Sequence, residues 1–206
     1  MIELTTPISE ADARRLKIGD PVLLNGIVVT GRDEAHKYIV DAYVRSQGAI
    51  PPAEQALHER LKQLLAGSLI YHCGPVVSRD ASGAWRFVAA GPTTSAREEP
   101  YQADVLEYFQ LRGVIGKGGM GEKTLAGLAR TGACYFHAIG GAATLIAKRC
   151  KKVLEVHKLE TFGSPEAFWV LEVEKFPVVV TMDSHGGSIH REIEARSKAV
   201  RDQLAY

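Results

Sequence analysis

The chain has 206 residues, of which 46% are hydrophobic and 24% are charged, and its formal net charge is +1. This composition predicts an ordered globular protein, which we expect to form a single domain over residues 1–206, and it argues against disorder. The near balance of charge argues against nucleic-acid binding, and no apolar run reaches the roughly 20 residues of a membrane span. The N-terminal sequence lacks the pattern of a signal peptide, so we expect a cytoplasmic location.

The first half of the chain combines β-branched strands with helices. In chain order the pattern predicts a strand at residues 22–30, a helix at 33–45, a short helix within 50–66, and two strands within 69–77 and 85–95. A turn at residues 80–83 separates the last two strands, and Asp33 is expected at the N-cap or in the first turn of its helix. This half is therefore expected to contribute some antiparallel pairing.

The second half alternates more regularly between strands and helices. The predicted elements are a helix at 98–112, a strand at 114–115, a helix at 122–130, a strand at 133–139, a helix at 142–149, a strand-like segment at 152–160, a strand pair within 167–184 and a terminal helix at 191–204. We expect the strand pair to be broken near Pro177. The alternation predicts an α/β fold with a mixed sheet.

The segment GVIGKGGMGEKT, residues 113–124, matches the G-x-G-x-x-G pattern through Gly116, Gly118 and Gly121. A dinucleotide site also needs an acidic residue about 20 positions later, and the segment FHAIGGAAT contains none. A Walker loop ends in Gly-Lys-Thr, whereas residue 122 is Glu. The loop therefore favours a small anion over a nucleotide, and a tight turn with a solvated Lys117 is the alternative.

Three predicted strand-to-helix junctions each present a cation. They contain Arg32 in IVVTGRD, Arg97 in AAGPTTSAR and Lys117 in the glycine loop. In α/β folds the carboxyl ends of the strands border the ligand site, and paired arginines suit carboxylates. We therefore predict an anion pocket for a small dicarboxylate with a Thr hydroxyl among the cations. Taken singly, each cation would also fit a surface or helix-cap role.

Three cysteines, Cys73, Cys134 and Cys150, are widely spaced and form no C-x-x-C pair. Three thiols can in principle hold an iron–sulfur cluster. However, Cys134 lies in an apolar strand pattern, and Cys150 lies near a predicted helix end. We expect buried or incidental thiols and no metal site in this chain.

Four motifs, GDPVLLNGIVVTGRDEAH, GPTTSAR, GKGGMG and IGGAA, occur in this order within residues 1–193. Together they resemble the β subunit of the iron–sulfur hydro-lyases, the class I fumarate hydratases and L-tartrate dehydratases. The resemblance implies a swivelling β/β/α domain that is active only with an α subunit, commonly as an α2β2 heterotetramer. It also implies that three cysteines of the α subunit hold a [4Fe–4S] cluster whose open iron acts as a Lewis acid, so this chain would bind no cluster alone.

The resemblance also implies roles for individual residues. Arg32 and Arg97 match arginines that bind substrate carboxylates, Thr93 matches the proposed catalytic base, and Lys117 matches the cation beside that base. A Thr hydroxyl needs such cations to act as a base, because its pKa is otherwise far too high. Residues expected to support this site, without contacting the reacting atoms, are His36, Gly116 and Gly118.

Two features leave the substrate open. Glu98 follows Arg97 where the family pattern has Met, and a carboxylate there could reorient the arginine. The segment HAIGGAATLIAK resembles the fumarate hydratase pattern, so interconversion of fumarate and L-malate is the favoured activity. L-tartrate dehydratase and mesaconate hydratase are the enzymatic alternatives, and a non-catalytic dicarboxylate-binding module is the alternative of a different class. His185 lies in a polar segment and is expected to be only a turn residue.

Overall fold

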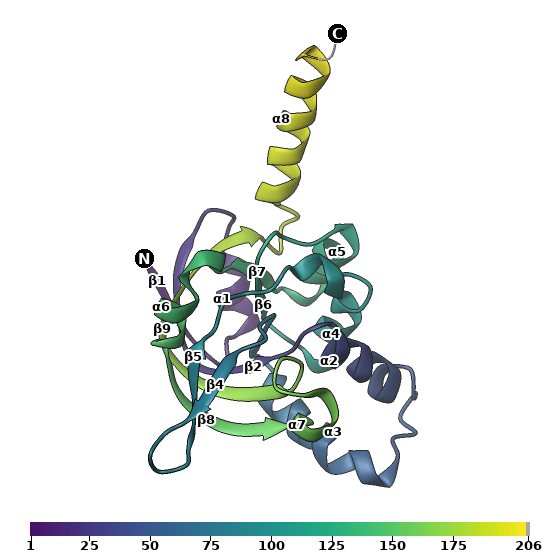
Figure 1. Ribbon diagram of the computed structural model, residues 1–206. Helices are drawn as coiled ribbons and strands as arrows, with labels where there is room; N and C mark the ends of the chain where they lie inside the picture. The colour runs from purple at the N-terminus through teal and green to yellow at the C-terminus, as the bar shows by residue number, and fades with distance from the viewer. Residues whose placement is uncertain (205–206) are drawn as a thin grey trace.

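The computed structural model describes residues 1–204 (Figure 1). Its strands are β1 Ile2–Thr5, β2 Pro21–Thr30, β3 Leu69–Tyr71, β4 Val76–Arg79, β5 Trp85–Ala89, β6 Gly113–Gly116, β7 Cys134–His137, β8 Cys150–His157 and β9 Phe168–Met182. Its α-helices are α1 Glu10–Arg15, α2 Asp33–Ile39, α3 Pro52–Leu65, α4 Gln102–Phe109, α5 Glu122–Thr131, α6 Ala143–Ala147, α7 Leu159–Phe162 and α8 Ile189–Leu204. Shorter helical turns are η1 Val40–Val44, η2 Ser95–Glu98 and η3 Gly140–Ala142. The prediction of a mixed α/β fold is confirmed.

One seven-stranded sheet forms the frame of the molecule, in the order β1-β2-β3-β6-β7-β9-β8. Strands β1, β2, β3, β6 and β7 pair in parallel, and β9 runs antiparallel to β2, β7 and β8. Because β9 pairs with both β7 and β2, the ring β2-β3-β6-β7-β9 closes on itself. The expected antiparallel pair in the first half is the β4–β5 hairpin, a separate two-stranded sheet.

Successive residues of the central strands face two different cores, because side chains alternate across a strand. Leu69 and Tyr71 of β3 belong to one core, which also contains Trp169 of β9 and α1 and α6 residues. Ile70, between them, belongs to the other core, which lies against helices α2, α3, α4 and α5. Strands that bury both faces read as continuous apolar runs, which explains why the segments around β6 and β7 show no polar alternation.

The terminal helix projects from the body of the molecule (Figure 1). The sequence pattern predicts it at residues 191–204, and the structure places it at Ile189–Leu204 with no buried residue. Its exposed apolar side chains include Ile193, Val200 and Leu204. Among residues 1–204, no helix combines the length and the apolarity needed to cross a bilayer.

Several predicted elements need correction. The segment 69–77, predicted as one strand, divides into β3 of the large sheet and β4 of the hairpin, and the strand-like segment 152–160 ends at His157, before α7. The strand pair broken near Pro177 is one continuous strand, β9, in which Pro177 pairs with Leu23. The irregularity lies instead at Lys175, which has a φ of 50°, and its N–H donates to the side chain of Asn25 at 2.8 Å. The helix predicted at 98–112 begins only at Gln102, after the tight turn η2, and ends at Phe109.

Candidate active site

The register of the parallel strands brings two of the predicted cations to one edge of the sheet. Tyr71 of β3 pairs with Thr30 of β2 on one side and with Ile115 of β6 on the other. Arg32 lies two residues beyond Thr30, and Lys117 lies two residues beyond Ile115. Since neighbouring strands are about 4.8 Å apart, the two backbones lie about 10 Å apart across β3. This spacing suits a small molecule with two anionic groups.

Thr93 is hydrogen-bonded to the residue that follows β3, the strand between the Arg32 and Lys117 junctions. Its N–H donates to the His72 carbonyl at 2.7 Å, and its hydroxyl donates to the same carbonyl at 3.2 Å. The next residue, Thr94, forms a parallel bridge with Lys117, and Ser95 N–H donates to the Lys117 carbonyl at 3.1 Å. The loop after β5 is therefore held by backbone bonds at the ends of both β3 and β6, and Thr93 and Lys117 lie in adjoining segments.

Arg32 is the N-cap residue of α2 and has a side chain that is 18% exposed. One terminal nitrogen, Nη1, lies 3.0 Å from a carboxylate oxygen of Glu166, and Nη2 lies 3.9 Å from Asp33. The Nε–H donor is buried and has no hydrogen-bond partner within residues 1–204. A buried donor without a partner costs free energy, so this guanidinium retains capacity for one more anionic acceptor.

The other two cations are more accessible. Arg97 lies on η2 with a half-exposed side chain, and its Nη2 lies 3.6 Å from Asp33. Lys117 is half-buried and forms no ion pair with any residue of the described chain. Its aliphatic stem lies against Gly140, where an added Cβ would be 3.3 Å from Lys117 Cδ. The glycine of the IGGAA motif therefore leaves room for the lysine.

Two of the predicted supporting glycines differ in their surroundings. A Cβ on Gly116 would lie 1.9 Å from Ser95 Oγ and 2.8 Å from Tyr135 Oη, so only glycine fits there. Gly118 has a φ of 83° and meets no atom within 4 Å, so it is required for its backbone conformation alone. Gly116 therefore permits close packing of the glycine loop against the Thr93 segment, and Gly118 permits the turn of the loop.

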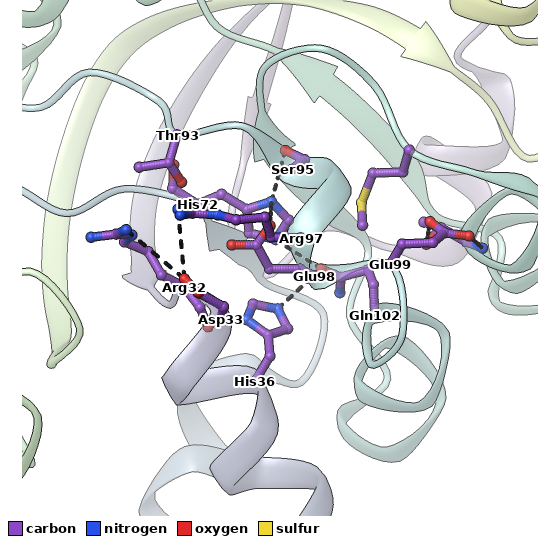
Figure 2. A network of polar contacts seen from close by, with 12 residues as sticks. Arg32, Asp33, His36, His72, Thr93, Ser95, Arg97, Glu98, Glu99 and Gln102 are labelled. Carbon is purple, nitrogen blue, oxygen red and sulfur yellow. Dashed lines mark hydrogen bonds and ion pairs between the residues drawn. The ribbon is translucent and has the colours of Figure 1, made fainter.

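The predicted supporting residue His36 is fully buried in a polar network beneath the site (Figure 2). Its Nδ1 lies 2.8 Å from the Arg32 carbonyl, and its Nε2 lies 3.0 Å from the side-chain amide of Gln102. The same amide lies 2.8 Å from His72 Nε2, and His72 Nδ1 lies 2.8 Å from Ser95 Oγ. The network thus joins the start of α2 to the segment that carries Thr93.

The contacts of this network fix the state of both imidazoles. Burial lowers the pKa of His36 to about 4, and burial followed by the proximity of His36 lowers the pKa of His72 well below its usual value. A backbone carbonyl only accepts, so neutral His36 carries its hydrogen on Nδ1 and accepts at Nε2. In the structure Gln102 Oε1 faces both Nε2 atoms and the Gln102 NH2 group has no partner among residues 1–204. A half-turn of this amide exchanges its oxygen and NH2 group, so that NH2 donates to both Nε2 atoms and His72 Nδ1–H donates to Ser95 Oγ.

Glu98, which departs from the family pattern, lies in the same network and is fully buried. Its Oε2 is 3.9 Å from His72 Nδ1, and neither carboxyl oxygen has a hydrogen-bond partner among residues 1–204. Burial raises the pKa of this carboxyl to about 7, opposed first by the backbone N–H of Glu98 itself and then by Arg97 and Arg32, while Asp33 adds to the increase. Glu98 is therefore a buried, proton-binding group, and its expected effect on the orientation of Arg97 stays a prediction.

Three supporting residues carry no local sequence signal of their role. His72 and Gln102 complete the buried network, and Glu99 caps helix α5, where its carboxylate accepts from Gly121 N–H at 2.7 Å and from Thr124 Oγ1 at 2.7 Å. Each acts across 20 or more positions in the chain, so no local motif contains both partners.

The three cysteines do not form a metal site. Cys73 and Cys134 are buried, Cys150 is partly buried, and no group of three His, Cys, Asp or Glu residues in 1–204 is arranged to hold a metal ion. Burial raises the pKa of each thiol, to about 12 for Cys134 and Cys150, which disfavours the thiolates that bind iron. The residues of this chain therefore do not fit an iron–sulfur cluster.

His185 has the turn role predicted for it. Its N–H donates to Asp183 at 2.9 Å, and its ring Nε2 lies 2.7 Å from the Arg14 carbonyl. These contacts fasten the turn between β9 and α8 to the region of α1, away from the Thr93 segment in sequence and in the sheet. The residue therefore belongs to the frame of the molecule.

Comparison with known proteins identifies the family of this chain. Residues 1–193 match the family described as fumarase C-terminus. A Geobacillus stearothermophilus protein provisionally named a class I fumarate hydratase is 49% identical over 96% of this chain, which spans 35% of that relative's length. An Escherichia coli L(+)-tartrate dehydratase β subunit is 34% identical over 98% of this chain and 92% of its own length. A Methanocaldococcus jannaschii protein provisionally named with the same function is 37% identical over 92% of this chain.

These matches define the class of protein: a mixed α/β domain related to fumarate hydratase and L-tartrate dehydratase chains, which are hydro-lyases. The chain belongs to the fumarase C-terminus family. The resemblance to the class I fumarate hydratases and L-tartrate dehydratases is thereby confirmed.

Proposed function

We propose that this chain is the β subunit of a two-chain [4Fe–4S] hydro-lyase that interconverts fumarate and L-malate by reversible hydration. The observation that carries the proposal is the register of β2, β3 and β6, which aligns Arg32, the anchored Thr93 and Lys117 along one edge of the sheet. The identity of 49% to the Geobacillus relative supports fumarate as the substrate. The anion pocket formed by these strand-to-helix junctions, and swivelling of the domain on binding, are parts of the same proposal.

Arg32 and Arg97 bind the substrate carboxylates in this mechanism. Arg32 has an unsatisfied Nε–H donor, and Arg97 is half-exposed and lies one short turn after Thr93. Guanidinium groups bind carboxylates through paired, charge-assisted hydrogen bonds, which orient the substrate as well as hold it. With both ends held, the carbon between them is placed against Thr93.

Thr93 removes the proton in the dehydration direction. An ionised Thr93 oxygen takes the proton from carbon, the electron pair of that C–H bond forms the double bond, and hydroxide departs from the neighbouring carbon. Lys117, in the segment bridged to Thr94, favours the ionised oxygen. In hydration the same hydroxyl returns its proton to carbon.

A partner chain completes the enzyme. The relatives from E. coli and M. jannaschii are named as β subunits, so we propose an α subunit that holds the cluster, in an α2β2 assembly. We assign the cluster to that partner, because Cys73 and Cys134 are buried, Cys150 is partly buried, and the three thiols are not grouped within residues 1–204. The chain alone is therefore expected to bind a dicarboxylate without turning it over.

The test is co-expression with the candidate α chain, anaerobic purification, and an absorbance assay with fumarate, L-malate and L-tartrate. Turnover that needs both chains, is lost in Thr93→Ala and persists in Thr93→Ser supports the proposal. Thr94→Ala is the matched control, because Thr94 is exposed and contributes its backbone to the bridge with Lys117. Equal loss in both alanine variants, with the assembly intact, would contradict the role of Thr93.

A tartrate dehydratase is the second candidate. The E. coli and M. jannaschii relatives carry tartrate dehydratase β subunit names and match this chain over 92% and 91% of their own lengths, which supports this candidate. The same assay decides between the two, since the higher kcat/KM identifies the substrate. Assembly without turnover of any of the three compounds would favour a methylated substrate such as mesaconate, and failure to assemble would favour a non-catalytic dicarboxylate-binding module.

A further inference from the structure

The carboxyl group of Glu98 is buried beside the candidate site without a hydrogen bond from any other residue of the described chain. The residue has no exposed surface, and neither carboxyl oxygen has a partner in the part of the chain that the structure describes. Glu is almost never fully buried unless it is paired, and an isolated carboxylate in such a place is strongly disfavoured. The position of Glu98 therefore needs an explanation beyond packing.

The groups around Glu98 come from every element packed against it. They are Arg97 on η2, Arg32, Asp33 and His36 from the start of α2, His72 at the end of β3, Gln102 on α4 and Tyr135 on β7. Both imidazoles are held neutral by burial, and burial raises the pKa of the Tyr135 hydroxyl. Near neutral pH the carboxyl of Glu98 is therefore the member of this group whose charge changes.

The charge of Glu98 determines the net charge of the anion site. The site contains three cations, Arg32, Arg97 and Lys117, and two carboxylates, Asp33 and Glu166, that lie against the arginines. With Glu98 protonated, the site carries one excess positive charge for a substrate dianion. With Glu98 ionised, the excess is cancelled, and Arg97 gains a competing anion on the adjoining residue.

We propose that Glu98 is a positioning residue that controls dicarboxylate affinity: the site binds the dianion while the buried carboxyl holds its proton, and ionisation of Glu98 weakens binding. This inference rests on the proposed function, because it takes Arg32, Arg97 and Lys117 as the carboxylate site. Glu98 does not contact the reacting atoms. It acts through the charge and orientation of Arg97 and through the network that joins His72 to Ser95.

The experiment measures the Kd of fumarate, L-malate and L-tartrate for the full chain by calorimetry at pH 6.0 and 8.5, and KM over the same range for the assembled enzyme. For the unmodified chain, Kd is expected to rise about tenfold, the effect of one buried charge roughly 10 Å from the ligand at an effective dielectric constant of about 20. Glu98→Gln keeps the shape of the side chain without its proton and is expected to change Kd less than twofold over this range. Glu98→Met, which removes the polar group, is expected to behave in the same way.

Glu59→Gln is the matched control, because it removes an exposed carboxylate of helix α3. It should retain the tenfold pH dependence. A Kd that is equal at both pH values in the unmodified chain, or a dependence that persists in Glu98→Gln, overturns the inference while leaving the dicarboxylate site in place. Failure of all three dicarboxylates to bind at either pH overturns the proposed function together with this inference. A merely structural role for Glu98 would change Kd equally at both pH values, which also refutes the inference.

Discussion

Substitution of Gly116 by Ala tests whether close packing between the glycine loop and the Thr93 segment holds the site together. The added Cβ would lie 1.9 Å from Ser95 Oγ, 2.8 Å from Tyr135 Oη and 3.2 Å from His72 Nδ1. All three contacting atoms belong to buried side chains. A separation of 1.9 Å cannot persist, so the Ser95 hydroxyl must move.

Movement of Ser95 breaks two buried hydrogen bonds. Its Oγ lies 2.8 Å from His72 Nδ1 and 2.8 Å from Tyr135 Oη. Each bond contributes about 1 kcal/mol, and leaving its buried partner unsatisfied adds about 1 kcal/mol or more. The expected loss in the free energy of unfolding is therefore about 3–5 kcal/mol, together with a loss of turnover because Ser95 is two residues from Thr93.

Urea unfolding at pH 7 measures this loss, with Gly118→Ala as the matched control. Gly118 has a φ of 83° and no atom within 4 Å of an added Cβ, so its substitution costs only backbone strain of about 1 kcal/mol. The Ser95→Ala/Gly116→Ala double variant should cost little more than Ser95→Ala alone, since the obstructing oxygen is then absent. If Gly116→Ala costs no more than Gly118→Ala, the packing argument is refuted.

Three further predictions concern the Glu99 carboxylate that caps α5, the Lys117 side chain, and the buried imidazole of His36. Glu99→Ala should lower the free energy of unfolding by about 2–3 kcal/mol, because the first turn of α5 loses its carboxylate cap. Urea unfolding measures this loss, and a loss below about 0.5 kcal/mol would contradict the prediction. Lys117→Met should leave the unfolding midpoint nearly unchanged and lower kcat at least roughly 100-fold in the assembled enzyme, and retention of kcat within about tenfold would rule out its role. In Glu98→Gln, stability should fall by at least about 2 kcal/mol between pH 7 and pH 5. The pKa of His36 is lowered from about 6.5 to about 4 on folding, so below pH 6.5 the unfolded chain binds more protons and stability is lost as pH falls. Equal stability of that variant at both pH values, from urea unfolding, would show that His36 is not held neutral by folding.

The local elements of the site could be predicted from the sequence because each junction carries its own signal. A β-branched run followed by an acidic first turn predicted β2 and α2, and glycines after an apolar run predicted the turn between β6 and α5. The general rule for parallel strands brings the junctions after β2 and β6, with Arg32 and Lys117, to one edge of the sheet. It does not place Thr93, because Thr93 follows β5 of the separate hairpin and is positioned by its bonds to the His72 carbonyl and by the bridge between Thr94 and Lys117.

The buried network could not be predicted, because its members are far apart in the chain. His36 and His72 meet through Gln102, which is 66 and 30 positions away from them. Glu98 is polar, follows Arg97 and belongs to a sequence pattern that favours exposure, yet it is fully buried. The sequence also did not predict that β9 is continuous. Pro177 indicated a break in the strand, but the pairing of β9 with β2, β7 and β8 keeps the strand intact through this proline.

The closed ring of strands has a consequence for how the chain folds. Strand β2 has its antiparallel partner in β9, so that Pro21 pairs with Val179 at the opposite end of the sequence. During synthesis, β2 and β7 therefore remain without this neighbour until β9 has been made. Pairings of such large sequence separation slow folding, because the entropy of closing a long loop is lost before the contacts form. Refolding from urea should accordingly be slow, on the order of milliseconds to seconds, and the chain should be most exposed to aggregation before β9 joins β2 and β7.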